Sequence, residues 1–156
     1  MAAKMRLTKE LKDIQKSPTL KSHGISVYLP SDSNILYWNA SMIAPTGSLY
    51  QGANLKLEIN LSERYPFEPP KVVKFLKPIP YHLNVGQSDG QVCIGLLKSD
   101  QWNPTASNCC IESVLTTIFA ALARPQPDSI VDDDVNSTYM HNRSVYEERA
   151  RRSVKA

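Results

Sequence analysis

Hydrophobic positions divide the chain into a helical start, a strand-rich middle and a helical end. Leu7, Leu11 and Ile14 recur with the spacing of one helix face, which predicts an amphipathic helix at the N-terminus. We expect Ser17-Pro18 to end this helix, because proline lacks an amide donor and restricts the residue before it.

The middle of the chain predicts the strands of an antiparallel sheet. In the clearest segment, 53–61, apolar and polar residues alternate strictly, as in a strand that buries one face and exposes the other to water. Three further segments predict strands at 25–29, 35–43 and 72–76. Turn-forming residues separate the first three strands at 30–34 and 44–47.

The last third of the chain predicts helices. A broad apolar face between Cys110 and Leu122 is typical of a core-facing helix, which Ser107 or Asn108 could cap. We expect it to end at 124–127, with a short helix starting at 132–134 and a polar helix over 144–155. This order predicts an α+β fold, formed as a single domain over residues 1–156, with helices on one side of a four-stranded antiparallel meander.

Composition excludes several classes of function. The chain has 156 residues, 42% hydrophobic and 21% charged, which is ordinary for a globular protein, and its net charge of +3 is too small to indicate a nucleic-acid binder. No apolar run approaches the ~20 residues of a membrane span, and no secretory signal is evident. We therefore expect neither nucleic-acid nor membrane partners.

Three cysteines, two of them adjacent, make a poor disulfide framework: Cys93, Cys109 and Cys110. This usage fits a reducing cytoplasmic or nuclear compartment, where an isolated cysteine is a candidate nucleophile. We expect no metal site, because adjacent cysteines chelate badly and no Cys-x-x-Cys spacing occurs.

Candidate chemistry lies in segment 77–105, which shows no sustained period and is typical of an active-site loop. Cys93 lies near His82 and Asn84 in sequence, which suggests acyl or thioester chemistry with thiolate attack and an amide donor for the oxyanion. The same pattern fits a buried structural cysteine equally well. Cys109, near a helix N-terminus, is a rival nucleophile, whereas Cys110 should be inert on the apolar helix face.

Two aromatic residues have alternative interpretations. Phe67 lies in the proline-rich run 65–71, where its ring either caps the core or is held outward by the rigid loop. Trp102, in the run 101–104, is expected to anchor the core.

Taken together, these motifs resemble the ubiquitin-conjugating (E2) enzyme family over nearly the whole chain. The matching pieces follow the family order of basic helix, meander, Tyr-Pro-Phe-x-Pro-Pro-Lys, His-x-Asn, Gly-x-Val-Cys, Trp-x-Pro, core helix and Pro-x-Pro. Details such as Gly90-Gln91-Val92-Cys93 and Pro125-Gln126-Pro127 are similar to the branch that serves HECT and RBR ligases.

The resemblance implies a role for each matching residue. Cys93 would accept ubiquitin, or a ubiquitin-like modifier, from an E1 enzyme as a thioester. It would then pass the modifier to a ligase cysteine or, less readily, to a substrate lysine. Asn84 would support the loop and stabilise the oxyanion, and His82 would be mainly structural. The E2 itself would need no cofactor, because the partner E1 consumes ATP.

Binding residues also follow from the resemblance. Arg6 and Lys9 match helix positions that meet E1 and ligases of the HECT, RBR or RING type, although a merely solvated face would look the same. Phe67 matches an aromatic that inserts into ligase grooves, and Asn103 and Pro104 belong to a second ligase-contacting loop.

Some positions depart from the family pattern. Leu83 replaces the usual proline, which should free the backbone near Asn84. Gly95 and Ser129 align with carboxylates of lysine-reactive members, although phosphorylation of Ser129 could restore charge. Two alternatives remain: an E2 for a ubiquitin-like modifier, and an inactive E2-like binding module.

Overall fold

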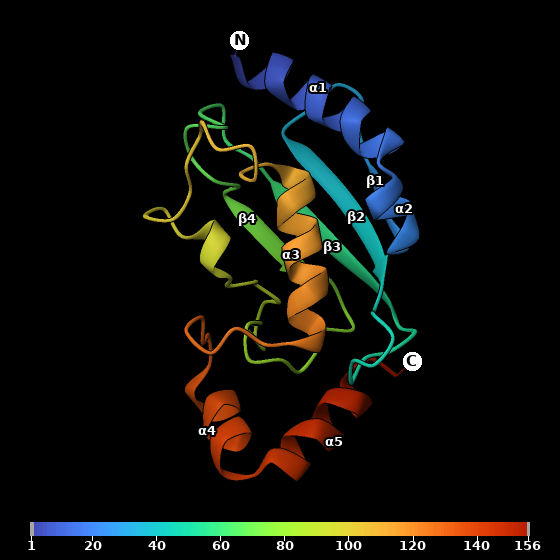
Figure 1. Cartoon of the computed structure of the whole chain (residues 1–156), viewed down its shortest axis with the longest axis vertical. Helices are drawn as coiled ribbons and strands as arrows, with labels where there is room; N and C mark the ends of the chain where they lie inside the picture. Colours follow the sequence, from blue (N-terminus) through green and yellow to red (C-terminus); the bar gives the residue numbers. More distant parts are fainter. Residues whose placement is uncertain (1, 156) are drawn as a thin grey trace.

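The computed structural model describes residues 2–155, in which a helical start, a four-stranded sheet and a helical end follow one another (Figure 1). The elements are α1 (Ala2–Lys16), α2 (Pro18–Ser22), β1 (Ile25–Tyr28), β2 (Tyr37–Ile43), β3 (Asn54–Asn60), β4 (Val72–Phe75), the 3-10 turn η1 (Gly95–Leu97), α3 (Ile111–Ala123), α4 (Asp133–His141) and α5 (Arg143–Ser153). The predicted α+β class is confirmed. Within the described residues, no helix is both long and apolar enough to span a bilayer.

The sheet is an antiparallel meander in the order β1-β2-β3-β4. Trp38 faces Ile59 and Met42 faces Leu55 in the register of β2 and β3, and all four side chains are buried. The alternation in segment 53–61 therefore correctly predicted which side of β3 faces the core. In Figure 1, α3 crosses this buried face, while α4 and α5 lie at the opposite end of the molecule from α1.

Ser17-Pro18 ends α1 as expected, but it also begins a second helix that the sequence pattern did not predict. The hydroxyl of Ser17 accepts a hydrogen bond from Leu20 N at 3.2 Å, and Pro18 takes the first helical position. Proline is favoured there because its missing amide donor would have had no helical partner anyway. Leu20, on this short helix, is buried in the core.

The expected cap of the core helix is wrong. Helix α3 starts at Ile111 with Cys110 at the N-cap, and neither Ser107 nor Asn108 caps it. Instead, Glu10 Oε1 accepts a hydrogen bond from Ile111 N at 2.8 Å, from a position 101 residues away in sequence. A carboxylate at a helix N-terminus also interacts favourably with the helix dipole.

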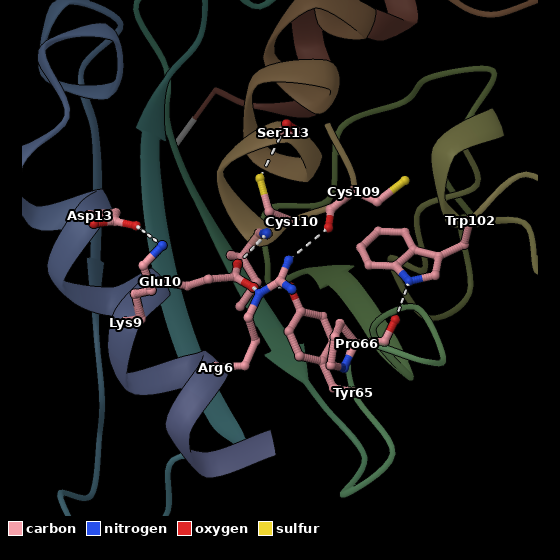
Figure 2. A network of polar contacts seen from close by, with 11 residues as sticks. Arg6, Lys9, Glu10, Asp13, Tyr65, Pro66, Trp102, Cys109, Cys110 and Ser113 are labelled. Atoms are coloured by element: carbon pink, nitrogen blue, oxygen red, sulfur yellow. Dashed lines mark hydrogen bonds and ion pairs between the residues drawn. The ribbon is translucent and has the colours of Figure 1, made fainter. Parts of the chain in front are cut away.

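The Glu10 carboxylate joins three segments of the chain (Figure 2). Besides Ile111 N, it accepts Arg6 Nε at 2.7 Å within α1 and the Tyr65 hydroxyl at 2.5 Å. Glu10 is 7% exposed, and burying such a charge is unfavourable unless donors surround it. Burial and the nearby Glu10 charge raise the pKa of Tyr65, which keeps the phenol protonated as a donor.

Segment 90–92 docks against the edge of β4 through an obligatory glycine. Phe75 N donates to Gly90 O at 2.8 Å, and Val92 N donates to Val73 O at 2.9 Å. Gly90 has φ +78°, and a Cβ added there would lie 2.2 Å from Phe75 O. The aperiodic segment therefore packs onto the sheet, and this places Cys93 immediately after a fixed point.

We expect Glu10→Gln to lower the free energy of unfolding by about 2–3 kcal/mol in urea denaturation. The glutamine side chain has nearly the same volume as glutamate, but its NH2 group cannot accept the hydrogen bonds that Arg6, Tyr65 and Ile111 donate. Asp13→Asn on the same helix is the control, because the Lys9–Asp13 pair is 3.9 Å long and exposed. It should shift stability by less than about 0.5 kcal/mol, and equal effects of the two changes would contradict the role given to Glu10.

Gly90→Ala should destabilise the protein by more than about 2 kcal/mol, because the methyl group meets backbone that cannot yield and the φ is strained. Gly52→Ala separates the two causes, since Gly52 has φ +81° but nothing within 4 Å of the added Cβ. That control should cost only about 1–2 kcal/mol. Similar losses for both variants would show that the close approach to Phe75 has no energetic importance.

Candidate functional site

Cys93 lies between two segments that hold its backbone. Its N–H donates to Asn84 O at 2.8 Å, and the preceding residue, Val92, forms a bridge with Val85. The residue is half-buried, so it is neither enclosed in the core nor fully solvated. A nucleophilic thiol needs this combination of fixed placement and access.

The side chain of Asn84 is buried and uses all of its donors. Nδ2 donates to Gln126 O at 2.8 Å and to Ser129 O at 2.7 Å, and Oδ1 accepts from Gln126 N at 2.8 Å. We call these three bonds the Asn84–Gln126 clamp. The clamp holds the segment after α3 against the residue whose carbonyl binds Cys93 N. Both amide hydrogens are engaged here, so donation to an oxyanion by Asn84 requires one of these bonds to break and stays a prediction.

His82 is enclosed in the core behind the clamp. Asn84 N donates to Nδ1 at 3.0 Å, so Nδ1 is the unprotonated nitrogen and Nε2–H donates to Ala121 O at 2.6 Å. Burial lowers the pKa of His82 to about 4, opposed only partly by the bond to Ala121. A neutral ring with both nitrogens engaged joins α3 to the loop, an arrangement that agrees with a structural role.

Leu83 does not loosen the loop in the way that loss of proline suggested. Its side chain is buried, its N–H donates to the Tyr146 hydroxyl at 3.2 Å, and its carbonyl accepts from Val131 N at 3.3 Å. The N–H that proline would lack is therefore used for a bond to α5. This hydrogen bond offsets the greater conformational entropy that leucine, compared with proline, loses when the chain folds.

Gln126 contributes more to the site than its motif indicated. Its main chain forms the clamp, while its side-chain Oε1 accepts Gly95 N at 2.8 Å and the Ser129 hydroxyl at 3.3 Å. The residue thus contacts the chain both before and after Cys93. Sequence reasoning missed it, and the only signal was its place between two prolines.

The residues expected to bind E1 and ligases come from three segments. Arg6, Lys9 and Pro104 line a groove of about 520 Å³ between α1 and the loop before α3, but Phe67 and Asn103 do not. Arg6 also bonds to Glu10 and, at 3.3 Å, to Cys109 O (Figure 2), so part of its side chain is committed internally.

Phe67 is 68% exposed, so the interpretation that its ring caps the core is wrong. The neighbouring residues provide the anchoring instead, since Tyr65 is fully buried and Trp102 Nε1 donates to Pro66 O at 2.7 Å. Trp102 is itself buried, which confirms it as a core anchor. This bond ties the Phe67 loop to the run that continues into exposed Asn103.

The two adjacent cysteines exchange their expected environments. Cys109 is buried, with Asn103 N donating to its sulfur at 3.3 Å, whereas Cys110 is half-exposed with its sulfur 3.3 Å from the Ser113 hydroxyl. The expectation for Cys110 fails because α3 starts after it, so it is not on the helix face. Within residues 2–155, no three His, Cys, Asp or Glu side chains gather as a metal site would require.

Ser129 is only 3% exposed, whereas the neighbouring Asp128 is exposed. A kinase cannot reach a buried hydroxyl in the folded chain, so the expectation that phosphorylation of Ser129 restores charge is wrong. Gly95 begins η1 and has open space around it, because an added Cβ would meet only Gln126 Oε1 at 3.7 Å.

Comparison with known proteins relates this geometry to a family. The family model described as "Ubiquitin-conjugating enzyme" matches residues 6–154. The ubiquitin-conjugating enzyme E2 T of Xenopus laevis is 37% identical over 150 residues, which cover 94% of this chain and 73% of that protein. Among solved structures, the E2 domain of a Toxoplasma gondii ubiquitin conjugating enzyme is similar with a TM-score of 0.80 and 30% identity, covering 97% of this chain and 96% of that one.

These similarities extend over the helical start, the meander, the cysteine-bearing loop and the C-terminal helices. The chain therefore belongs to the ubiquitin-conjugating (E2) enzyme family, whose members are transferases with ubiquitin, an E1 enzyme and E3 ligases as their general partners.

Proposed function

We propose that this chain carries ubiquitin, or a ubiquitin-like modifier, as a thioester on Cys93. The observation that supports this most directly is the placement of half-buried Cys93 beside the Asn84–Gln126 clamp, whereas Cys109 is buried and Cys110, also half-buried, lies at the N-cap of α3. The Cys93 thiolate attacks the carbonyl carbon of the E1 thioester, and a tetrahedral intermediate forms. The intermediate then collapses with the E1 thiolate as leaving group.

The modifier leaves Cys93 by a second transfer. We propose that a ligase cysteine of the HECT or RBR type is the preferred acceptor and that lysine is a poorer one. The alternatives are an E2 that uses a ubiquitin-like modifier and an inactive binding module. Incubation with E1, ATP and each modifier in turn distinguishes them, because only the cognate modifier gives a band that a reducing agent removes.

Cys93→Ser should replace the labile thioester with a slower-forming ester that resists reducing agents, because a hydroxyl is the weaker nucleophile near neutral pH. Cys109→Ser and Cys110→Ser should still form the thioester, as judged on non-reducing gels. Normal thioester formation by Cys93→Ser would show that another residue carries the modifier.

A ligase groove is the proposed binding site for Phe67. The backbone on the N-terminal side of Phe67 is held by buried Tyr65 and by the hydrogen bond from Trp102 to Pro66. Docking of the exposed ring would therefore order little additional chain. Buried aromatic anchors of this kind can each contribute about 2 kcal/mol or more to an interface.

Phe67→Ala should therefore slow discharge to a HECT or RBR ligase by at least about tenfold while leaving E1 charging and the urea midpoint unchanged. Met140→Ala is the matched control, since Met140 is 64% exposed on α4, far from this loop. Equal discharge by the two variants would exclude Phe67 from the ligase interface.

The preference for thiols rests on missing carboxylates. A lysine amine has a pKa near 10.4 and must lose a proton before it attacks, whereas a few per cent of a thiol is already ionised at neutral pH. Gly95 offers no base, and the buried hydroxyl of Ser129 offers none either. Asp128, next to Ser129, is an exposed carboxylate.

The charged protein, freed of E1 and ATP, should discharge much faster to free cysteine than to free lysine at equal concentration. Gly95→Asp should raise the lysine rate, because it adds a carboxylate two residues after Cys93, at a position where an added Cβ meets nothing closer than 3.7 Å and φ is not positive. Gly95→Asn is the neutral control of the same shape. If the wild-type protein discharged to lysine and to cysteine at comparable rates, the preference for thiols would be refuted. If Gly95→Asp and Gly95→Asn raised the discharge rate to lysine equally, the charge of the carboxylate would not be the cause. Ser129→Asp is unsuitable, because it would bury an unpaired charge.

A further inference from the structure

The carboxamide of Gln126 is oriented so that its amide hydrogens are free. Gly95 N can only donate, so the Gln126 atom 2.8 Å from it is the oxygen, and Nε2 points away from Gly95. The Ser129 hydroxyl donates to the same oxygen at 3.3 Å. Within residues 2–155, Nε2 has no acceptor, and this nitrogen is not among the buried polar atoms that lack a partner, so it faces accessible space.

Asn84 has no comparable freedom. Both of its amide hydrogens are donated to main-chain carbonyls of Gln126 and Ser129 at 2.8 and 2.7 Å. Donation to a substrate would break one of these bonds inside a site that is 1% exposed, leaving a buried carbonyl unpaired. Of the carboxamides of Asn84 and Gln126, only that of Gln126 can donate without such a loss.

Gln126 is also tied to both sides of Cys93. Its main chain bonds to Asn84, whose carbonyl accepts Cys93 N, and its side chain bonds to Gly95 N two residues past the cysteine. Two residues of chain span roughly 7 Å at most, so the carboxamide lies in the immediate surroundings of the Cys93 backbone. The Gln126 carboxamide therefore borders the segment that carries Cys93.

We propose that Gln126 Nε2 is the amide donor to the thioester carbonyl on Cys93, and that Asn84 is the positioning residue that holds Gln126 in place. This rests on the proposed function. As an acceptor thiolate adds to the carbonyl carbon, the π electrons move to oxygen, and the Nε2–H bond to that oxygen strengthens as its charge grows. Collapse of the intermediate restores the carbonyl and expels the Cys93 thiolate.

Gln126→Glu separates donation from positioning. The carboxylate has the same shape and still accepts from Gly95 N and the Ser129 hydroxyl, but it cannot donate at neutral pH. Charged with ubiquitin to completion and freed of E1, this variant should discharge to free cysteine at least about tenfold more slowly than wild type. Gln101→Glu adds the same charge at an exposed position on the loop after η1 and should stay within about twofold of wild type.

A pH profile gives the second measurement. The deficit of Gln126→Glu relative to wild type should shrink as pH falls toward the ordinary glutamate pKa of about 4.3, because the protonated carboxyl regains a donor. A purely structural role would predict full activity for Gln126→Glu and a loss only for Gln126→Ala.

Each outcome is decisive. The proposal is overturned if Gln126→Glu discharges at a rate within about twofold of wild type. It is also overturned if Gln101→Glu loses as much discharge rate as Gln126→Glu, or if the loss in Gln126→Glu does not change with pH. Failure of wild-type protein to form a reducible adduct with any modifier overturns the proposed function instead, and it is seen before any Gln126 variant is compared. A urea midpoint for Gln126→Glu equal to that of wild type assigns its deficit to transfer rather than to folding.

Discussion

The buried carboxylate of Glu10 decides how α1, the proline-rich loop and the start of α3 are assembled. Its donors come from α1 itself, from the start of the proline-rich loop and from the first residue of α3. A charge that is 7% exposed cannot tolerate the loss of these partners, so the three segments can satisfy it only together. The exposed Phe67 and the groove lined by Pro104 are therefore placed by an interaction beneath the surface, not by contacts of their own.

Helix α3 connects that end of the molecule to the candidate chemistry. Glu10 holds its first residue, and His82 binds the carbonyl of Ala121 near its last turn. Thirteen residues of helix span about 20 Å, and they are packed on the sheet by side chains such as Val114 and Ile118. Both ends of this rigid element are thus fixed by buried hydrogen bonds to segments that carry candidate functional residues.

The sequence predicted the elements whose formation depends on local periodicity. The alternation in 53–61 predicts the buried side of β3, and the apolar spacing between Cys110 and Leu122 predicts the core-facing side of α3. Two of the missed features depend on partners distant in sequence: the cap of α3 comes from Glu10, and the N–H of Leu83 is bound by Tyr146. Helix α2 was missed for a different reason, since its cap is local but its five residues are too few to show a helical period. Periodicity records which side of an element is apolar, but it carries no information on which polar group will meet another across the fold.

The same distinction separates supporting residues from candidate catalytic ones. His82 and Asn84 are buried and use their ring nitrogens and amide hydrogens within the protein, so any new bond to a substrate would break an existing one. Fully satisfied buried polar groups stiffen a site because every alternative arrangement costs a hydrogen bond. Gln126 differs, since its oxygen is held by two donors while its amide hydrogens have no acceptor among residues 2–155. A donor whose orientation is fixed before the reaction needs no reorganisation when charge develops on a nearby oxygen, and such preorganisation lowers the barrier to transfer.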